Sequence, residues 1–383
     1  MCSAFIWSGP SLLSHKAKVS WNMVTRPLSE GGLGLRPLKE INKISALKLV
    51  WRILSAHDSM WVTWTHQNLI GKNSFWSLKE KTQAGSWIWR KLLKLRPVAK
   101  LFHRMDIRSG SATSFWFDHW SSLGRLVDIL GQRGYIDLGF RENTTVEMVL
   151  KHHRRRRHRV GILNQVEDEI EKYRASANYD LKDVALWKCG HEKFKQRFRS
   201  KDTWLQIRQT NIRWGWEEVV WFKYATPKYS LFHWTVMHNS ISTGDRMIKW
   251  NANANPSCVF CNHPLETVDH LFFSCPFSEQ IWQTLIRGLL RDRYTTNWHE
   301  VLSLVKDSSQ DRISMFILRY TLQATMYGIW RERNDRRHGG NPSHQARLIK
   351  LIDKTVRNRL SGIRTQGDHT YDDGLELCFS TRS

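Results

Sequence analysis

Long apolar runs, acidic residues and cysteines are all scarce in this chain of 383 residues. No stretch of about 18 consecutive apolar residues occurs, which argues against a membrane-spanning helix. The nearest approach, residues 315–330, is interrupted by Arg319 and Gln323. The N-terminus also lacks a basic segment followed by an apolar run and a small-residue cleavage site. We therefore expect a protein that is neither secreted nor embedded in a membrane.

Six cysteines are too few for a disulfide scaffold at this length. Three of them lie close together near residue 260, which favours a metal site in a reducing compartment. Cys2, Cys189 and Cys378 have no such neighbours and are expected to be plain thiols.

Acidic side chains are outnumbered, with 35 Asp and Glu against 59 Lys and Arg, so the formal net charge is +24. Such an excess favours a polyanionic partner, either nucleic acid or an acidic membrane surface, and charge alone does not choose between them. Hydrophobic residues make up 41% of the chain and 20 residues are Trp. This composition supplies sizeable cores, and the length suggests two or three domains.

Motifs of the common catalytic sites are missing. The glycines of residues 30–35 do not have the GxGxxG spacing of a nucleotide-binding loop, and neither GxSxG nor HExxH occurs. Tyr371-Asp372-Asp373 resembles the metal-binding carboxylate pair of a polymerase, but Thr370 stands where that motif needs an aromatic residue. We expect a solvated acidic turn there, no enzyme activity and no small-molecule substrate.

Apolar periodicity predicts a fold of the α+β class, predominantly helical, with small β-hairpins. One hairpin is expected from residues 104–108 through a turn at Ser109-Gly110 to Phe115 and Phe117, and another over residues 181–198. Residues past 362 are expected to be frayed. Helices are predicted over residues 41–54, 86–95, 163–173, 281–289, 313–327 and 343–356.

A basic run occupies residues 151–159 and includes Arg154, Arg155, Arg156 and Arg157. It is either a solvated loop or a functional patch that contacts phosphate or directs nuclear import. The four arginines repel one another unless an anion, or the acidic face of residues 167–171 that follows, compensates their charge.

The most specific pattern is C-x2-C-x8-H-x4-C, formed by Cys258, Cys261, His270 and Cys275. Zinc prefers four such ligands in a tetrahedron, and because all four positions are filled the site is expected to be structural, with one Zn²⁺. The alternative is three reduced cysteines with an incidental histidine. His263 is a rival ligand, but it lies only two residues after Cys261 and would strain the chelate ring. A zinc ion here would fold a segment with little core of its own.

Several motifs occur in the order found in one known family. They are Phe5-Ile-Trp-Ser-Gly9, Lys18-Val-Ser-Trp21, Glu30-Gly-Gly-Leu-Gly-Leu35, Leu47-Lys-Leu-Val-Trp-Arg-Ile-Leu54, Ser86-Trp-Ile-Trp-Arg-Lys-Leu-Leu93, Ser114-Phe-Trp-Phe-Asp-His-Trp120, Lys201-Asp-Thr-Trp204, Trp221-Phe222, Pro227-Lys-Tyr-Ser230, Thr243-Gly-Asp-Arg246 and Trp330-Arg-Glu-Arg-Asn334 with Arg337-His338. Together with the CCHC pattern they resemble the C-terminal part of plant non-LTR (LINE-type) retrotransposon reverse transcriptases.

The resemblance implies a division into segments. Residues 1–100 would be a helical remnant of the polymerase thumb or connection, 101–190 an α+β linker region, and 191–290 the reverse-transcriptase zinc-binding domain. Residues 291–362 would be C-terminal helices and 363–383 a tail. The catalytic palm would lie upstream of Met1 and the endonuclease is not represented, so we expect a fragment or orphan descendant without polymerase activity of its own. A polymerase domain acting in trans remains an option.

Two functions are open. The first is a zinc-stabilised module that binds RNA or DNA without sequence preference, with Arg213, Trp214, Trp216 and Lys223 stacking on bases and holding phosphates. For most of the tryptophans core packing is the simpler role. The second is an inactive retrotransposon-derived remnant or protein-interaction scaffold. The basic run and the family favour the nucleus, and the cytoplasm is an alternative.

Overall fold

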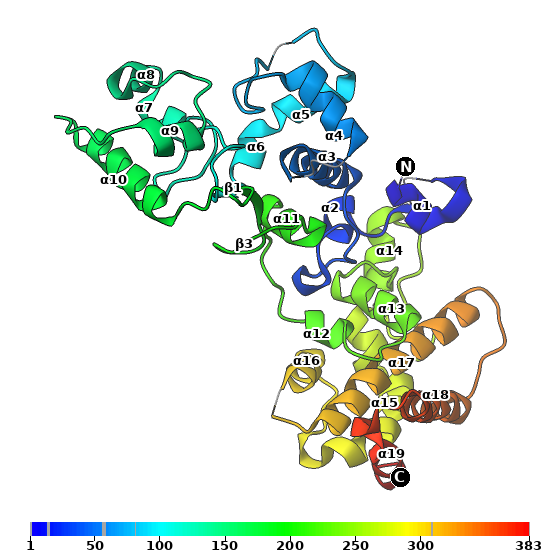
Figure 1. The fold of residues 1–383 in the computed structure, drawn as a ribbon. Coiled ribbons are helices and arrows are strands. Elements are labelled where there is room, and N and C mark those ends of the chain that lie inside the picture. The colour runs from blue at the N-terminus through cyan, green and yellow to red at the C-terminus, as the bar shows by residue number, and fades with distance from the viewer. Residues whose placement is uncertain (1, 14–15, 56–58, 81, 308, 383) are drawn as a thin grey trace. The chain divides into compact units, whose positions relative to one another are not determined.

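The computed structural model describes residues 2–13, 16–55, 59–80, 82–307 and 309–382. It divides into two compact units (Figure 1). Unit 1 combines residues 1–35 with residues 211–383, and unit 2 consists of residues 36–210. The five segments expected from the family resemblance end at residues 100, 190, 290, 362 and 383, whereas the two units divide after residues 35 and 210. The assignment of those segments stays a prediction.

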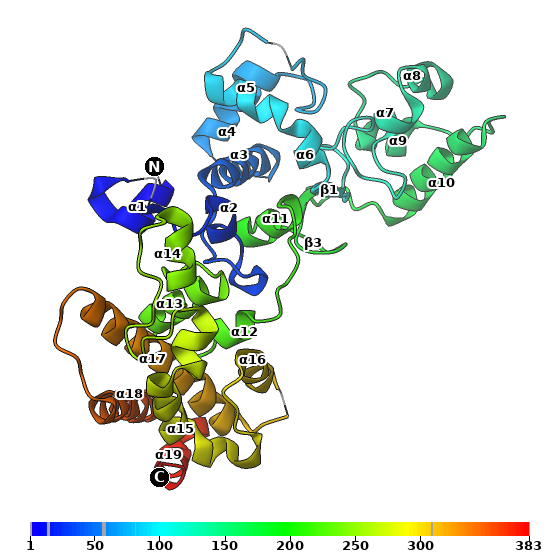
Figure 2. The same ribbon diagram turned by 180° about the vertical axis from the view of Figure 1, so that it is seen from behind.

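Unit 2 is built of helices and one small antiparallel sheet. Figure 2 shows α9 alongside α10. The elements in chain order are α3 (Leu38–Ser55), α4 (Met60–Thr65), α5 (Trp87–Lys94), α6 (Arg96–Lys100), β1 (His103–Asp106), α7 (Leu126–Leu130), α8 (Arg133–Leu138), α9 (Val146–His152), α10 (Gly161–Ser176), β2 (Val184–Lys188), β3 (Phe194–Lys195) and α11 (Ser200–Ile207).

The predicted helices of unit 2 are confirmed and follow from local sequence. In α3, the stripe that includes Ile44, Leu47 and Val50 is buried. The Ser86 hydroxyl caps α5 by accepting a hydrogen bond from the backbone N–H of Trp89. Leu163, Val166 and Ile170 form the buried face of α10. Helix α5 ends at Lys94, and Pro97 lies in the first turn of the short α6, where its missing N–H costs no helical bond.

The described strands form one antiparallel sheet in the order β1-β2-β3. The hairpin β2-β3 is confirmed, with Trp187 opposite Lys195. The other predicted hairpin is wrong, because β1 pairs with β2, and His103 lies opposite Trp187. The chain bends at Arg108 and Ser109, and Gly110 has a positive φ of 77°, but the residues after it form a loop and turns instead of a returning strand.

Two carboxylates hold that loop away from strand geometry. Asp183 accepts hydrogen bonds from the backbone N–H groups of Arg108 and Gly110 at 2.8 Å each. Asp118 accepts from the N–H of Ser114 and from Trp76 Nε1, also at 2.8 Å. With their donors satisfied by side chains, residues 108–118 need no partner strand.

Unit 1 is helical in its described residues. Figure 1 shows α17 and α18 side by side. The helices are α1 (Cys2–Ser8), α2 (Trp21–Val24), α12 (Glu217–Val220), α13 (Pro227–Met237), α14 (Gly244–Trp250), α15 (Pro276–Leu290), α16 (Trp298–Lys306), α17 (Arg312–Arg337), α18 (Gln345–Thr365) and α19 (Gly374–Ser380). The predicted helices at residues 281–289, 313–327 and 343–356 are therefore confirmed.

The polar residues of the apolar stretch in α17 have structural roles. Gln323 is fully buried, and its amide donates to the carbonyls of Val219 and Val220 at 3.1 and 3.0 Å. Arg319 Nε donates to the carbonyl of Val305 at 2.9 Å. Among the helices that the structure describes, none is long and apolar enough to cross a membrane.

The C-terminal tail is ordered, which corrects the expectation of fraying past residue 362. Tyr371 and Cys378 are buried in the core of unit 1. Gly374 in α19 approaches Leu360 so closely that an added Cβ would lie 2.8 Å from the Leu360 side chain. The tail packs because α19 supplies the apolar residues that cover one end of α17 and α18.

The first 35 residues belong to unit 1 through a separate hydrophobic cluster. Val19 and Val24 are buried there with Trp216, Val220 and Trp234. The glycine-rich turn contributes directly, because the Gly31 carbonyl accepts hydrogen bonds from Trp234 Nε1 at 2.7 Å and from His238 Nε2 at 3.0 Å. This turn is structural, as its sequence indicated.

Candidate metal centre

The ligand atoms of Cys258, Cys261, His270 and Cys275 all lie within 4.8 Å of one another. The sulfurs of Cys258 and Cys275 are 3.9 Å apart, and Cys261 Sγ lies 3.2 Å from His270 Nε2. Four ligands around a tetrahedral zinc, with Zn–S bonds of about 2.3 Å, would place two sulfurs roughly 3.8 Å apart. The cluster therefore has the dimensions of a zinc site.

A disulfide would require a bond of about 2.05 Å, so the separation of 3.9 Å excludes a Cys258–Cys275 disulfide in this structure. All described cysteines are free thiols. Cys258 and Cys275 are completely buried, and His270 is 9% exposed. Three sulfurs and an imidazole facing one another in a buried position fit a soft divalent ion better than an incidental grouping.

The first two ligands converge through a tight turn. The backbone N–H of Asn262 donates to the Cys258 carbonyl, and the N–H of Cys258 donates to the His263 carbonyl, each at 2.9 Å. Asn262 adopts the left-handed conformation with φ 58°, which asparagine tolerates better than most residues. This turn brings the side chains of Cys258 and Cys261 to the same side of the loop.

The other two ligands come from the following helical segment. His270 opens a π-helical turn, His270–Ser274, and the N–H of Cys275 donates to the His270 carbonyl at 2.8 Å. Cys275 directly precedes α15, whose first residue is Pro276. Leu271, Phe272 and Phe273 between the two ligands are buried in the core of unit 1, so packing fixes the position of both ligands.

His263 is not part of the cluster. Its ring stacks on that of His270, with centroids 4.4 Å apart, and its Nδ1 lies 3.0 Å from the Leu265 carbonyl oxygen. The rival ligand considered from the sequence is thus directed into a local turn, and the four residues of the CCHC pattern are the ones brought together.

Without a metal ion, the contact between two of the sulfurs favours ionisation of one of them, that of Cys258. The Cys275 thiol donates to Cys258, and this hydrogen bond lowers the pKa of Cys258 while raising the pKa of Cys275. Ionised thiolates are the species that bind zinc. Three thiolates and Zn²⁺ together carry one negative charge, so a nearby cation would stabilise the loaded site.

Arg337 is the nearby cation. Its Nη1 donates to the Asn255 carbonyl at 3.1 Å and its Nη2 to the Ser257 carbonyl at 2.8 Å, just before Cys258. Burial lowers the pKa of Arg337, and the Cys258 sulfur opposes that shift. The guanidinium holds the loop that enters the cluster.

Arg333 holds the other side of the same loop through a buried ion pair. Its Nη2 lies 2.6 Å from Glu266 Oε1, and both side chains are almost fully buried. Glu266 also accepts from the backbone N–H of Gly244 at 3.2 Å. The sequence alone assigned no role to Glu266, Arg333 or Arg337, although both arginines belong to the motif at residues 330–338 that contributes to the family resemblance.

The arginines of the basic run lie in the loop between α9 and α10. Arg154, Arg155, Arg156 and Arg157 are all exposed. Arg155 pairs with Asp168, while the flanking His153 and His158 both contact the buried Glu167, at 2.8 and 3.0 Å. Asp168 and Glu167 of α10 therefore compensate part of the charge of the run, and the choice between a solvated loop and a functional patch stays open.

The remaining candidates lie in unit 1 and differ in accessibility. Arg213 is exposed and Trp214 is 53% exposed. Trp216 is only 6% exposed and packs in the cluster with Val19 and Val24, so its ring faces are covered. Lys223 extends into solvent, where its hydrogen bond to Asp368 raises its pKa. The roles of these residues in nucleic-acid binding stay predictions.

Comparison with known proteins agrees with the position of the cluster. Residues 198–282, which contain all four clustered side chains, match the family described as zinc-binding in reverse transcriptase. A "Putative ribonuclease H protein" of Arabidopsis thaliana is 23% identical over 304 residues, covering 74% of this chain and 46% of the relative. The chain thus spans less than half the length of that relative. No solved structure matches the chain.

These findings support a zinc-binding module related to reverse transcriptases. The matched segment also contains α13 and α14 and ends within α15. The cluster, the ion pair of Glu266 with Arg333 and the loop held by Arg337 therefore form one structural assembly around the matched segment.

Proposed function

We propose that this chain is a non-catalytic, zinc-stabilised module that binds single-stranded RNA or DNA without strong sequence preference. The observation that carries the proposal is the convergence of four zinc ligands within 4.8 Å, inside the segment that matches the reverse-transcriptase zinc-binding family. One Zn²⁺ would occupy this cluster and serve folding, since its four ligands leave no open coordination position for catalysis.

The charge and the exposed aromatic side chains support nucleic acid as the partner. The net charge of +24 favours polyanions. In α14, Trp250 is 62% exposed and the Arg246 guanidinium lies 5.4 Å from its ring centroid. Lys249 is exposed beside them. A base can stack on such a ring while the cations hold phosphates.

Helix α14 is also hydrogen-bonded to Glu266, which lies between the second and third ligands of the cluster. Its first residue, Gly244, donates to Glu266, and the Asp245 N–H donates to the Glu266 carbonyl at 3.0 Å. Zinc binding should therefore order the exposed face of α14 as well as the cluster. The proposal connects metal to nucleic-acid binding through this helix.

The proposal also includes the evolutionary origin of the chain and its lack of polymerase activity. The motif order and the similarity to a plant protein support descent from a plant LINE-type element. In the acidic pair near the C-terminus, Asp372 lies 3.0 Å from His369 Nδ1 and 3.8 Å from Arg364 Nε, so it is engaged in local contacts. We expect no extension of a primed template by the purified chain, and we propose that any synthesis needs a polymerase domain in trans.

The exposed arginines of residues 154–157 support nuclear import. A fluorescent fusion of the full chain should accumulate in the nucleus, and a variant with Arg154, Arg156 and Arg157 changed to Ser should spread into the cytoplasm. Equal distribution of the two fusions would contradict this part of the proposal.

The test of the function is binding of labelled single-stranded RNA by the zinc-loaded chain, followed by fluorescence anisotropy at several salt concentrations. The logarithm of the association constant should fall linearly with the logarithm of salt, with a slope of about −0.7 per phosphate contact. RNAs of unrelated sequence should bind alike. A folded, zinc-loaded chain that ignores RNA and DNA would instead favour the scaffold or remnant function.

A matched pair of cysteine variants connects the metal to this binding. Cys261→Ser should lose the zinc measured by metal analysis and weaken RNA binding, because it removes one of four ligands. Cys189→Ser, at a half-buried thiol outside the cluster, should keep both properties. Retention of a full equivalent of zinc by Cys261→Ser would rule out the assigned ligand set.

A further inference from the structure

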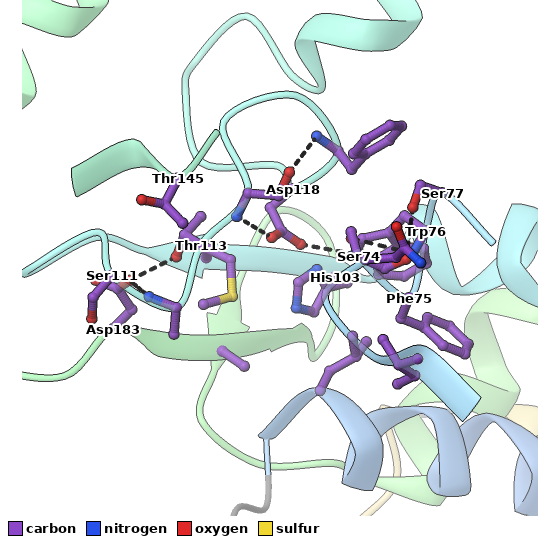
Figure 3. A pocket seen from close by; sticks show the side chains of 18 of the residues that line it. Ser74, Phe75, Trp76, Ser77, His103, Ser111, Thr113, Asp118, Thr145 and Asp183 are labelled. Carbon is purple, nitrogen blue, oxygen red and sulfur yellow. Dashed lines mark hydrogen bonds between the residues drawn. The ribbon is translucent and has the colours of Figure 1, made fainter. Parts of the chain in front are cut away.

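Unit 2 contains a cavity that the proposed zinc module does not use. Its volume is about 880 Å³, which lies within the range of small-molecule sites. It is bordered by β1, the start of β2, the loop of residues 108–118 and the segment of residues 72–77. Figure 3 shows Thr113 and Asp183 toward one end and Phe75 and Trp76 toward the other, with the His103 ring between them.

The floor of the cavity is apolar and buried. Ile53, Ile70, Phe75, Met105 and Ala185 line it, and each is less than 9% exposed. A flat ring would find dispersion contacts with this floor on entering the cavity and would leave water behind.

His103 is the exception in that floor. Its side chain is fully buried, it lines the cavity, and neither ring nitrogen has a hydrogen-bond partner. The Trp76 ring lies against it, with centroids 5.3 Å apart. Burial lowers the pKa of His103 to about 3, with Arg125 and His119 adding to the effect.

A neutral imidazole has one donor and one acceptor nitrogen. Both are unsatisfied here, and burying a polar group without a hydrogen-bond partner is unfavourable. A ligand that offers a hydrogen-bonding edge at this position would recover that cost. The edge of a nucleobase carries donors and acceptors side by side.

The mouth of the cavity, defined here as its lining residues with exposed side chains, is basic. It includes Lys72, Arg141 and Lys182, none of which has an acidic partner among the described residues. Lys182 adjoins Asp183 at one end of the cavity, whereas Lys72 is two residues from Ser74 at the other end (Figure 3). Glu142 is the exposed acid beside them. The carboxylate of Asp183 is already engaged, because it accepts from two backbone N–H groups and from the Thr113 hydroxyl at 2.8 Å each.

We propose that this cavity is a nucleotide-binding site, in which the base lies on the apolar floor against His103 and the phosphate lies at the mouth beside Arg141 and Lys182. The ligand is either a free nucleotide or one unpaired nucleotide of a bound strand. The site is independent of zinc, since all of its lining residues belong to unit 2.

The test is calorimetric titration of the full, zinc-loaded chain with each of the four ribonucleoside 5′-monophosphates. Nucleosides and inorganic phosphate are separate arms. We expect saturable binding of monophosphates and weaker binding of either part alone. If none of the four monophosphates binds with a saturable isotherm, the proposal is overturned.

Charge reversal at the mouth has a matched control. Arg141→Glu with Lys182→Glu should abolish monophosphate binding. Lys350→Glu with Lys354→Glu makes the same charge change on exposed positions of α18 and should leave it intact. An equal loss in both double variants would show that only net charge matters and would contradict a built site.

His103→Leu tests the floor without risking the fold, because it removes two unsatisfied nitrogens from a buried position. Binding of monophosphates should weaken about fivefold, the value of one hydrogen bond. Circular dichroism and urea unfolding should show a fold at least as stable as that of the parent. Unchanged affinity in this variant would remove His103 from the site.

Competition separates the two sources of ligand and separates this proposal from the zinc-module function. Displacement of a monophosphate by single-stranded RNA indicates a strand nucleotide, and monophosphate binding that RNA does not displace indicates a free nucleotide. If RNA binds with normal salt dependence while the mouth variants and their controls behave alike, the cavity proposal fails and the zinc-module function stands. If monophosphates bind to the chain but RNA does not, the cavity proposal stands and the zinc-module function fails.

Discussion

Two sets of residues build the metal cluster. The residues that form it were visible in the sequence, whereas the residues that hold its loop in place were not. The CCHC spacing identified the four residues that converge, because thiols and imidazoles in that order are rare outside metal sites. It did not identify Glu266, Arg333 or Arg337, since a carboxylate and two arginines far apart in sequence form no recognisable pattern. Long-range ion pairs of this kind are visible only in the fold.

Gly244 gives a residue-scale prediction about this geometry. A Cβ added there would lie 2.0 Å from the Pro256 carbonyl oxygen, whereas one added at Gly362 in α18 would meet nothing within 4 Å. Gly244→Ala should lower the free energy of unfolding of unit 1 by about 1–3 kcal/mol. Gly362→Ala should raise it by about 0.5–1 kcal/mol, because alanine loses less backbone entropy in a helix. Urea unfolding of the zinc-loaded chain measures both, and shifts of the same sign would contradict the packing.

The pH dependence of unit 2 is a second prediction at this scale. Burial lowers the pKa of His103 to about 3 and that of His119 to about 4, and it raises the pKa of Asp118 to about 6. Below about pH 6.5 the unfolded chain protonates both histidines while the folded chain does not, so stability is lost as pH falls toward 4. Asp118 acts in the opposite sense between about pH 4 and 6, because its folded state binds the proton more tightly.

Comparison of the parent with His103→Leu isolates one of these groups. The stability advantage of the variant should grow by about 1.4 kcal/mol for each pH unit between 6.5 and 4, the value of one proton. Urea unfolding at a series of pH values measures the difference, and effects of pH on the metal site cancel between the two proteins. A difference that stays constant with pH would mean that His103 titrates normally in the folded state.

At the scale of elements, the sequence predicted helices well and strand pairing poorly. Helices such as α3, α10 and α17 have apolar stripes whose period is local, so neighbouring residues suffice to define them. The partner of β1 is β2, about 80 residues later, and alternation of apolar residues carries no information about which strand pairs with which. The ordered tail was missed for a similar reason, because α19 is stabilised by contacts with α17 and α18.

The junction between α17 and the metal segment gives an element-scale prediction. Arg333→Ala would leave the buried Glu266 carboxylate without its main partner, which should cost about 3–5 kcal/mol. Arg331→Ala, at an exposed position two residues earlier on α17, should change stability by less than about 0.5 kcal/mol.

A double variant checks the cause. Glu266→Gln combined with Arg333→Met removes both charges and should recover much of the stability lost in Arg333→Ala, since no buried charge remains unpaired. Urea unfolding with zinc present gives all three values. Equal destabilisation by Arg331→Ala and Arg333→Ala would show that the ion pair contributes little.

For the whole molecule, the division into two units predicts separate responses to metal removal. The four cluster residues all belong to unit 1, and unit 2 has its own hydrophobic core. A chelator should therefore increase amide hydrogen exchange around α14, the π-helical turn His270–Ser274 and the start of α15, because a structural zinc contributes folding free energy there. Helices α3 and α10 should keep their protection.

Mass spectrometry of exchanged peptides measures this response, and added zinc should restore the protection of the affected peptides. Loss of protection throughout the chain would mean that the units fold as one cooperative body. The sequence indicated more than one domain from length alone, but it did not show that one unit is built from two separated stretches. That arrangement depends on the contacts of the first 35 residues, which no local pattern reveals.

The bond from Trp234 to Gly31 spans 203 positions of the chain, and it has a consequence for biosynthesis. As the polypeptide leaves the ribosome, residues 1–35 emerge before unit 2, and their partners in unit 1 emerge only after all of unit 2 has been made. Unit 2 can fold during translation. In residues 1–35, Val19, Val24 and the tryptophans stay exposed to solvent until the rest of unit 1 has been synthesised. Chaperones that shield nascent apolar segments should therefore matter most for residues 1–35.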